Sequence, residues 1–173
     1  ISLAFGVTGP CYTVSSACAS SGHAIIDAIE MLRRKACDVV ITGGTESSLT
    51  RLGMAAFAKM RALATSFNDN PAGAVRPFDK NREGLVMSEG AGIVVLETLE
   101  AARARGAQPQ ATLLGYGLTT DAHNIVRPEA EGIEPGRAIR NAVLSAGLQT
   151  EDIAERTYIN AHGTGTSLND ATE

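Results

Sequence analysis

The sequence contains no apolar run of about 18 residues, the length that a bilayer requires, so we expect no membrane-spanning segment. It also lacks a basic stretch followed by an apolar one, and no secretory signal is expected. Cys11, Cys18 and Cys37 are an odd number and include no Cys-x-x-Cys pair, which argues against a disulfide framework and against a structural zinc site. These absences favour a reducing, cytoplasmic location.

The chain also has no large excess of one charge. Lys plus Arg number 15 and Asp plus Glu 19, with no long basic run, so nucleic acid is not an expected partner. Its 173 residues, 44% hydrophobic and 20% charged, are typical of a globular domain. The chain begins at Ile1 and stops at Glu173, directly after a loop rich in glycine and threonine, and we expect it to be a piece of a longer protein.

Strand-like and helical segments alternate along the chain. Short runs of apolar and β-branched residues predict strands at residues 11–16, 39–42, 93–96, 111–116 and 158–161. Apolar residues at helical spacing predict helices over about residues 19–35 and 135–146, and a further helix that ends at Gly106. The alternation predicts an α/β layered fold, with an internal boundary at residues 106–110.

Cys18 is the sharpest candidate for a catalytic residue. It lies where a predicted strand turns into a predicted helix, within the sequence Ser-Ala-Cys-Ala-Ser-Ser of residues 16–21. The positive end of a helix dipole favours the nucleophilic thiolate, and the main-chain N–H of Cys18 can face a developing oxyanion. The alternative is a cysteine that only packs, as small apolar residues do.

His162 is the second candidate. It follows the last predicted strand, within Asn-Ala-His-Gly-Thr-Gly-Thr (residues 160–166), at the sheet edge where α/β proteins bind ligands. It can donate a hydrogen bond to a carbonyl or exchange protons near neutral pH, and Thr164 and Thr166 offer hydroxyl groups. The alternative is a loop histidine tied to a nearby carbonyl.

The remaining histidines are weaker candidates. His23 lies just over one helical turn after Cys18 and is interpreted as a packed helix residue. His123 lies in a polar loop and could line a substrate channel. A dinucleotide-binding glycine loop is absent, because the Gly-Ala-Gly of residues 90–92 precedes a predicted strand rather than following one.

Taken together, these segments resemble the β-ketoacyl synthases, the condensing enzymes of fatty-acid and polyketide synthesis. Residues 16–21 resemble the nucleophile motif of that family, and residues 160–166 resemble its first active-site histidine motif. Between them, further family motifs follow in order and at similar spacing, namely Arg-Ala-Leu (61–63), Asn-Asp-Asn-Pro (68–71), Arg-Pro-Phe-Asp (76–79) and Glu-Gly-Ala-Gly (89–92). The resemblance covers nearly the whole chain and is strongest to the elongating type I/II acyl-carrier-protein synthases.

The resemblance implies a thiolase-like α-β-α-β-α layered fold with two similar halves. Residues 1–108 would form the end of the N-terminal half, and residues 109–173 the start of the C-terminal half. A decarboxylative Claisen condensation is also implied: Cys18 takes an acyl group from acyl carrier protein as a thioester, malonyl-carrier protein loses CO2, and the resulting carbanion attacks that thioester. His162 would hydrogen-bond the malonyl thioester carbonyl and stabilise the enolate-like charge.

The same resemblance assigns supporting roles. Thr164 and Thr166 match positions that contact the phosphopantetheine arm of the carrier protein. Asp170 and Glu173 match acidic positions after the histidine motif, where Glu173 would anchor a lysine further along the protein. The resemblance implies no cofactor besides that phosphopantetheine. It also implies a homodimer for the full-length enzyme, and we expect the 173 residues alone to be inactive.

Some positions depart from the family pattern. Leu85 replaces a usual phenylalanine, Ser88 a usual glycine, and Asn124 and Val126 a usual histidine and threonine beside the pantetheine channel. Malonyl handling, acyl chain length and the choice between fatty-acid and polyketide pathways therefore stay open. Two other functions also stay open: a non-condensing subunit that binds carrier protein, and a thiolase relative that uses acyl-CoA.

Overall fold

The computed structural model describes residues 1–173 apart from the side chain of Asp152, and it divides into two compact units. Unit 1 comprises residues 1–47 and 89–112, and unit 2 comprises residues 48–88 and 113–173. Each unit is therefore built from two separate stretches of chain. The division into halves at residues 1–108 and 109–173 stays a prediction.

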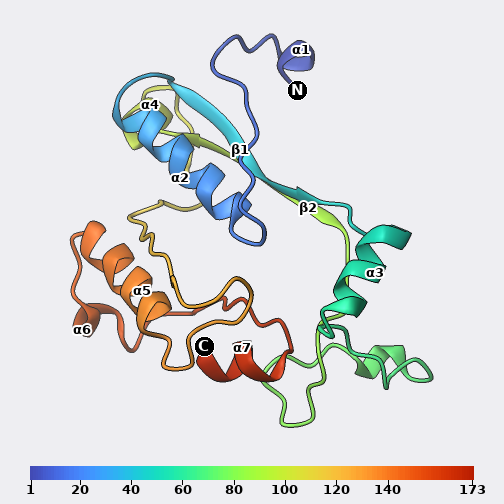
Figure 1. Cartoon of the computed structure of the whole chain (residues 1–173). Coiled ribbons are helices and arrows are strands. Elements are labelled where there is room, and N and C mark those ends of the chain that lie inside the picture. Colours follow the sequence, from blue (N-terminus) through green and yellow to red (C-terminus); the bar gives the residue numbers. More distant parts are fainter. The chain divides into compact units, whose positions relative to one another are not determined.

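Unit 1 is a two-stranded antiparallel ribbon with a helix packed against it (Figure 1). Strands β1 (Val39–Glu46) and β2 (Gly90–Glu97) pair along their whole length. Helix α2 (Ser20–Arg33) packs against β1 and buries Ala28, Met31 and Leu32, which recur at helical spacing. The short helices α1 (Ser2–Phe5) and α4 (Leu99–Ala104) complete the unit.

Glycines decide how closely the elements of unit 1 approach one another. A Cβ atom on Gly43 would lie 2.1 Å from the carbonyl oxygen of Gly92 on the paired strand. One on Gly44 would lie 2.5 Å from Cβ of Ser21, in the first turn of α2. The strand predicted over residues 39–42 therefore continues through both glycines, because their missing side chains make room for β2 and α2.

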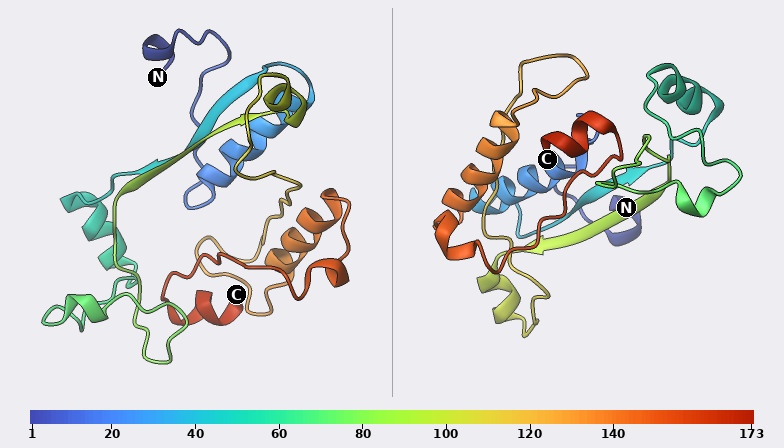
Figure 2. Two further views of the ribbon diagram at one scale, coloured as in Figure 1. Left: turned by 180° about the vertical axis from the view of Figure 1, so that it is seen from behind. Right: turned by 90° about the horizontal axis from the view of Figure 1, so that it is seen from below.

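Unit 2 is helical, with long connecting segments (Figure 2). Its helices are α3 (Arg51–Lys59), the 3-10 turn η1 (Pro71–Gly73), α5 (Ile133–Ser145), α6 (Thr150–Ile153) and α7 (Ser167–Thr172). A Cβ atom on Gly117 would lie 1.9 Å from the carbonyl oxygen of Ala138, so the chain around Gly117 runs directly against α5. Among the helices of the described chain, none has the length and apolar character that a bilayer crossing needs.

Three of the predicted strands are wrong. In the described residues, segments 11–16, 111–116 and 158–161 join no ladder, and Ser16 makes only an isolated bridge with Cys18. A run of β-branched residues favours an extended backbone, but a strand exists only where a neighbour supplies hydrogen bonds. Tyr116 instead donates its N–H to the hydroxyl of Ser145 in α5, at 2.8 Å.

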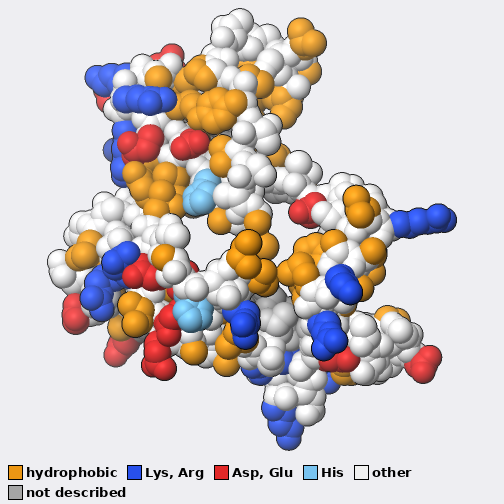
Figure 3. All heavy atoms as spheres, in the orientation of Figure 1, with side chains coloured by type: hydrophobic (Ala, Val, Ile, Leu, Met, Phe, Trp, Pro, Cys, Tyr) orange, Lys and Arg blue, Asp and Glu red, His pale blue; other side chains and the backbone are white. Residues whose placement is uncertain are grey.

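The apolar core is small for a chain of this size. Among the residues whose side chains are described, the buried hydrophobic ones are Ala28, Met31, Leu32, Ala74, Ala102 and Val143. Figure 3 shows hydrophobic side chains at many places on the surface. The exposed residues include Ile93, Val94 and Val95 of β2. Large apolar side chains of both units are therefore exposed in this stretch of chain.

Candidate active site

Cys18 lies at a sharp turn directly before α2. The preceding residue, Ala17, has φ 52°, a left-handed conformation that costs an L-residue about 1–2 kcal/mol. Helix α2 has Ala19 as its N-cap, without a side-chain cap, and Ser20 in its first turn bonds instead to the main chain before Cys18. Ser20 Oγ donates to the Ala17 carbonyl at 2.7 Å and accepts from the N–H of Ser16 at 2.8 Å.

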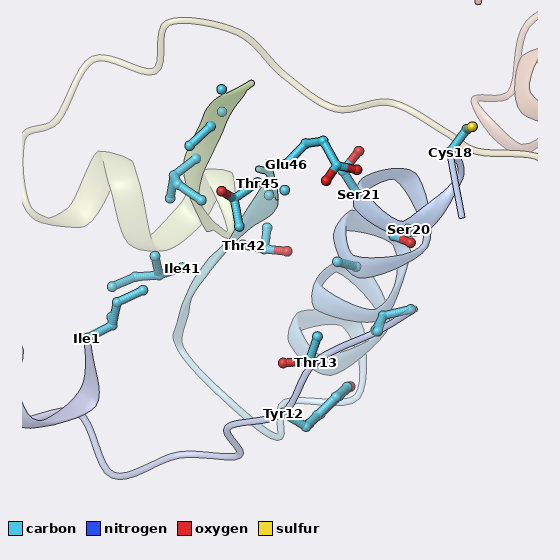
Figure 4. Close-up of a pocket in the computed structure, with 18 of the residues that line it drawn as sticks. Ile1, Tyr12, Thr13, Cys18, Ser20, Ser21, Ile41, Thr42, Thr45 and Glu46 are labelled. Carbon is cyan, nitrogen blue, oxygen red and sulfur yellow. The ribbon is translucent and has the colours of Figure 1, made fainter. Parts of the chain in front are cut away.

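An open cavity of about 620 Å³ lies beside Cys18, entirely within unit 1. Its walls are the segment 12–14, the first turns of α2, and the facing ends of β1 and β2. Figure 4 shows Cys18 at the beginning of α2, with its sulfur pointing away from the helix, and Ser21 close to Glu46 of β1. The cavity is within the size range of small-molecule sites, and it places an exposed thiol at its rim.

The loop that carries His162 is fixed through its main chain. The N–H groups of His162 and Gly163 donate to the two carboxylate oxygens of Glu173, at 2.7 and 2.8 Å. The amide of Asn169 donates to Glu173 as well, at 3.0 Å. The side chain of His162 is exposed and takes no part in these hydrogen bonds. Glu173 therefore sets the direction of the loop and leaves the imidazole able to meet a ligand.

Asp170 is the buried anchor of the same loop. Its carboxylate accepts from the N–H of Phe78 at 2.7 Å and from the N–H of Gly165 at 3.0 Å. Burial raises the pKa of this carboxyl, but hydrogen bonds from Phe78, Asn169 and Gly165 and the charge of Arg82 outweigh burial. The pKa of Asp170 therefore lies below its usual value, and the carboxylate is ionised at neutral pH.

Arg82 completes this network, and the sequence analysis missed it. Its guanidinium lies 3.6 Å from the Asp170 carboxylate and donates to the carbonyls of Thr166 and Ser167, at 3.1 and 2.6 Å. Phe78 has φ 65°, and its N–H is the one that Asp170 accepts, so the network also holds a left-handed turn. The position of Arg82, three residues after Arg-Pro-Phe-Asp, was the one sequence feature that could have indicated it. Its hydrogen-bond partners are more than 80 residues away, so the sequence does not show the contact.

A smaller cavity of about 250 Å³ lies beside His162 in unit 2. His162 and Thr164 line it, as do Arg76 and Leu85, one of the residues that depart from the family pattern. Thr166 is not among the lining residues, and its hydroxyl lies 2.9 Å from that of Thr164. The structure thus brings His162 and Thr164 to one cavity and places Thr166, Asp170 and Glu173 behind it.

The candidates fall into two groups, one in each unit. Cys18 belongs to unit 1, whereas His162 and the residues that support it belong to unit 2. His123 and Asn124 lie in an exposed loop, where the Asn124 side chain accepts from the N–H groups of Val126 and Arg127. No metal-binding group of three or more His, Cys, Asp or Glu side chains occurs in the described residues.

Known proteins resemble this chain along its whole length. The sequence model of the β-ketoacyl synthase N-terminal domain matches residues 1–102, and that of the C-terminal domain matches residues 110–173. The 3-oxoacyl-[acyl-carrier-protein] synthase 2 of Rhizobium meliloti (strain 1021) is 47% identical over 96% of this chain, and a mitochondrial 3-oxoacyl-[acyl-carrier-protein] synthase of Arabidopsis thaliana is 43% identical over 100% of it. This chain spans 39% and 37% of those two relatives, about two fifths of their length.

Solved structures agree in fold. A ketosynthase of a type II polyketide synthase, in complex with its acyl-carrier protein, superposes with a TM-score of 0.93 at 31% identity, over 99% of this chain and 41% of that one. A β-ketoacyl synthase from Burkholderia phymatum STM815 gives a TM-score of 0.89 at 37% identity, over 99% and 40% of the two chains. The two-stranded ribbon, the turn at Cys18 and the loop at His162 are thus parts of the thiolase-like fold of the ketosynthases, and the chain belongs to the β-ketoacyl synthase family.

Proposed function

We propose that the whole protein catalyses a decarboxylative Claisen condensation of acyl groups carried on acyl carrier protein, in fatty-acid or polyketide synthesis. The exposed thiol of Cys18, at the rim of a cavity and at the start of α2, supports this most directly. Membership of the β-ketoacyl synthase family supplies the reaction class. The acyl group passes from the carrier's thiol to Cys18, and the carrier thiol leaves with the proton.

His162 is proposed to act in the second half-reaction. The malonyl thioester loses CO2 and leaves a carbanion, whose negative charge spreads onto the thioester oxygen. A hydrogen bond from the imidazole of His162 stabilises that charge. The carbanion then forms a C–C bond to the acyl carbon, and the Cys18 thiolate leaves.

Supporting roles follow from the loop around His162. Thr164, which lines the cavity beside His162, is proposed to contact the phosphopantetheine arm, together with Thr166. Asp170 and Glu173 hold the loop through its main-chain N–H groups. The anchoring of a lysine by Glu173 stays a proposal, in which the carboxylate would serve the lysine and the loop together.

Partners and location belong to the same proposal. The whole protein is proposed to act as a cytoplasmic homodimer with acyl carrier protein, without a resident cofactor. A solved relative is described in complex with its acyl-carrier protein, and another in complex with a chain length factor. A non-condensing subunit that binds carrier protein is the second candidate, since Leu85 lines the cavity beside His162 and departs from the family pattern.

Labelling by cerulenin, an electrophilic acyl mimic, tests the proposal in the whole protein. Intact-mass measurement should show one adduct on the wild type and none on Cys18→Ala. Cys11→Ala is the matched control, because Cys11 is another exposed thiol and its loss should leave the adduct unchanged. A folded wild type without an adduct would favour the non-condensing subunit. In a separate assay of substrate preference, faster reaction with acyl-CoA than with acyl-carrier protein would favour a thiolase-like reaction.

A further inference from the structure

Ser16, two residues before Cys18, is tied to two side chains of α2. Its N–H donates to Ser20 Oγ at 2.8 Å, and its hydroxyl lies 2.6 Å from Nδ1 of His23. Ser20 Oγ donates in turn to the carbonyl of Ala17, at 2.7 Å. The main chain directly before Cys18 is therefore attached to α2 at both Ser16 and Ala17.

His23 is well placed to serve as a fixed attachment point. Its N–H donates to the carbonyl of Ala19 at 3.0 Å, which places it in the regular hydrogen bonding of α2, and its side chain is half-buried. A neutral ring with a bare Nδ1 accepts the proton of the Ser16 hydroxyl, whereas a ring that carries a proton on Nδ1 donates to that oxygen. The contact therefore requires a side chain at position 23 that carries a hydrogen-bonding atom where Nδ1 lies, whether that atom donates or accepts.

The two residues are separated from the cavity by the turn that they hold. Ala17, Cys18 and Ser20 line the cavity beside the thiol, whereas Ser16 and His23 do not. Any effect they have on Cys18 therefore acts through the main chain. Because Ala17 is held at φ 52°, a conformation that a non-glycine residue leaves readily, the turn needs contacts of this kind.

We propose that the hydrogen bond between Ser16 and His23 is a positioning contact, which keeps Ala17 in its left-handed conformation and thereby holds the Cys18 thiol exposed at the rim of the cavity. The proposal rests on the proposed function only in taking Cys18 as the reacting thiol. It replaces the sequence interpretation of His23 as a residue that merely packs.

Alkylation of Cys18 by iodoacetamide in the whole protein, resolved by peptide mass spectrometry at pH 7, measures the effect. His23→Leu removes the contact and should slow alkylation about fivefold, the size of one net hydrogen bond. In His23→Asn the side-chain amide is as many bonds from Cα as Nδ1 is in histidine, so this variant can keep the contact with Ser16 and should react at the wild-type rate. His23→Gln is the matched control, because its amide lies at the level of Nε2, and it should react as slowly as His23→Leu.

A double-mutant cycle separates the contact from general loosening. Ser16→Ala should slow alkylation as much as His23→Leu, and the double variant should be no slower than either, because both remove one interaction. Additive slowing, or rates equal to wild type in every variant, would overturn the proposal. If His23→Leu fails to fold, the comparison of slow Ser16→Ala with fast His23→Asn decides the same question.

The outcomes also separate this contact from the proposed function. Coupled slowing of alkylation in a protein that gives no cerulenin adduct and no condensation would contradict the proposed function and leave the positioning contact standing. A wild type that condenses and is labelled, together with unchanged alkylation in all variants, would contradict the positioning contact alone.

Discussion

The turn before Cys18 and the loop around His162 are both held in unusual backbone conformations, but by different chemistry. At the turn, Ala17 adopts a left-handed conformation and is held by the hydroxyl groups of Ser16 and Ser20 and the imidazole of His23. In the loop, Gly163 and Gly165 adopt positive φ values without a side-chain penalty, and carboxylates accept their N–H groups. The turn thus stores backbone strain, whereas the loop depends on charge.

This difference predicts how the turn and the loop respond to substitutions. Single hydrogen bonds of a hydroxyl group contribute little stability each, so the turn should loosen without unfolding of the protein. Hydrogen bonds to a carboxylate are stronger, and the side chain of Asp170 is fully buried, so its loss should affect the stability of the fold as well as the loop. Substitutions in the loop should therefore be the more damaging.

Gly165→Ala should have the largest effect. Gly165 has φ 75°, and a Cβ atom there would lie 2.6 Å from the carbonyl oxygen of Gly84. The cost of the left-handed backbone and the cost of the clash with Gly84 therefore add up. We expect a loss of about 4 kcal/mol in the free energy of unfolding, measured by urea denaturation of the whole protein. Gly106→Ala is the matched control, because Gly106 has φ 74° but open space, and it should cost about 1 kcal/mol. Equal losses would show that the contact with Gly84 does not matter.

Asp170→Asn should be next in size. The amide cannot accept from both N–H groups as the carboxylate does, and Arg82 loses its charged partner, so we expect a loss of about 3 kcal/mol in the free energy of unfolding. Asp79→Asn makes the same change at an exposed carboxylate, which accepts from the N–H of Asn81, and should leave stability nearly unchanged. A similar loss in both variants would contradict the view of Asp170 as the buried anchor.

The stability that Asp170 contributes should depend on pH. Because its pKa is lower in the folded protein than in the unfolded chain, this contribution is fully present above the unfolded value, about 3.9. It is lost as the pH falls through the lowered folded value. The stability difference between wild type and Asp170→Asn, followed by urea denaturation from pH 7 to pH 3, should therefore narrow only below about pH 4. A difference that already narrows at pH 6 would contradict the lowered pKa.

Glu173→Gln should affect the reaction more than the fold. The carboxylate holds the N–H groups of His162 and Gly163, and an amide would replace one acceptor oxygen by a donor. We expect condensation to slow about tenfold, with the melting temperature unchanged because Glu173 is exposed. Glu155→Gln, at another exposed position, should leave the rate unchanged. An unaltered rate in Glu173→Gln would show that the loop keeps its shape without the carboxylate.

Ala17→Gly should have the smallest effect, and its sign should be opposite. Glycine adopts the left-handed conformation at little cost, so the free energy of unfolding should rise by up to about 1 kcal/mol. Gly163→Ala, at φ 54°, is the reverse change in the loop and should lower the free energy of unfolding. Urea denaturation of both variants checks the pair, and a loss of stability in Ala17→Gly would contradict strain at the turn.

Helices were predictable because their signal is local. The helix expected over residues 19–35 is α2, at Ser20–Arg33, and that expected over residues 135–146 is α5, at Ile133–Ser145. Both were recognised by apolar spacing, which reflects hydrogen bonds made within four residues. The strand predicted over residues 39–42 was too short, because β1 continues through Gly43 and Gly44, whose missing side chains allow β2 and α2 to approach.

The candidate site was predictable only in part. The motifs indicated Cys18 and His162 as candidates, since residue type and neighbours mark a thiol before a helix and a histidine among glycines, but their catalytic roles stay a prediction. They did not reveal Arg82 or the contact of Ser16 with His23. An arginine that bonds carbonyls more than 80 residues away leaves no periodic pattern in the sequence.

The sequence by itself determined the family, the helices and the chemistry of the candidate residues, because these depend on residue identity and on contacts between near neighbours. Only the tertiary structure decided which extended segments became strands, which glycines had to stay free of a side chain, and that Asp170 and Arg82 would join two distant loops. Those outcomes depend on which parts of the chain meet in space. A buried backbone N–H or a buried charge is stable only where the fold places a hydrogen-bond acceptor or an opposite charge beside it.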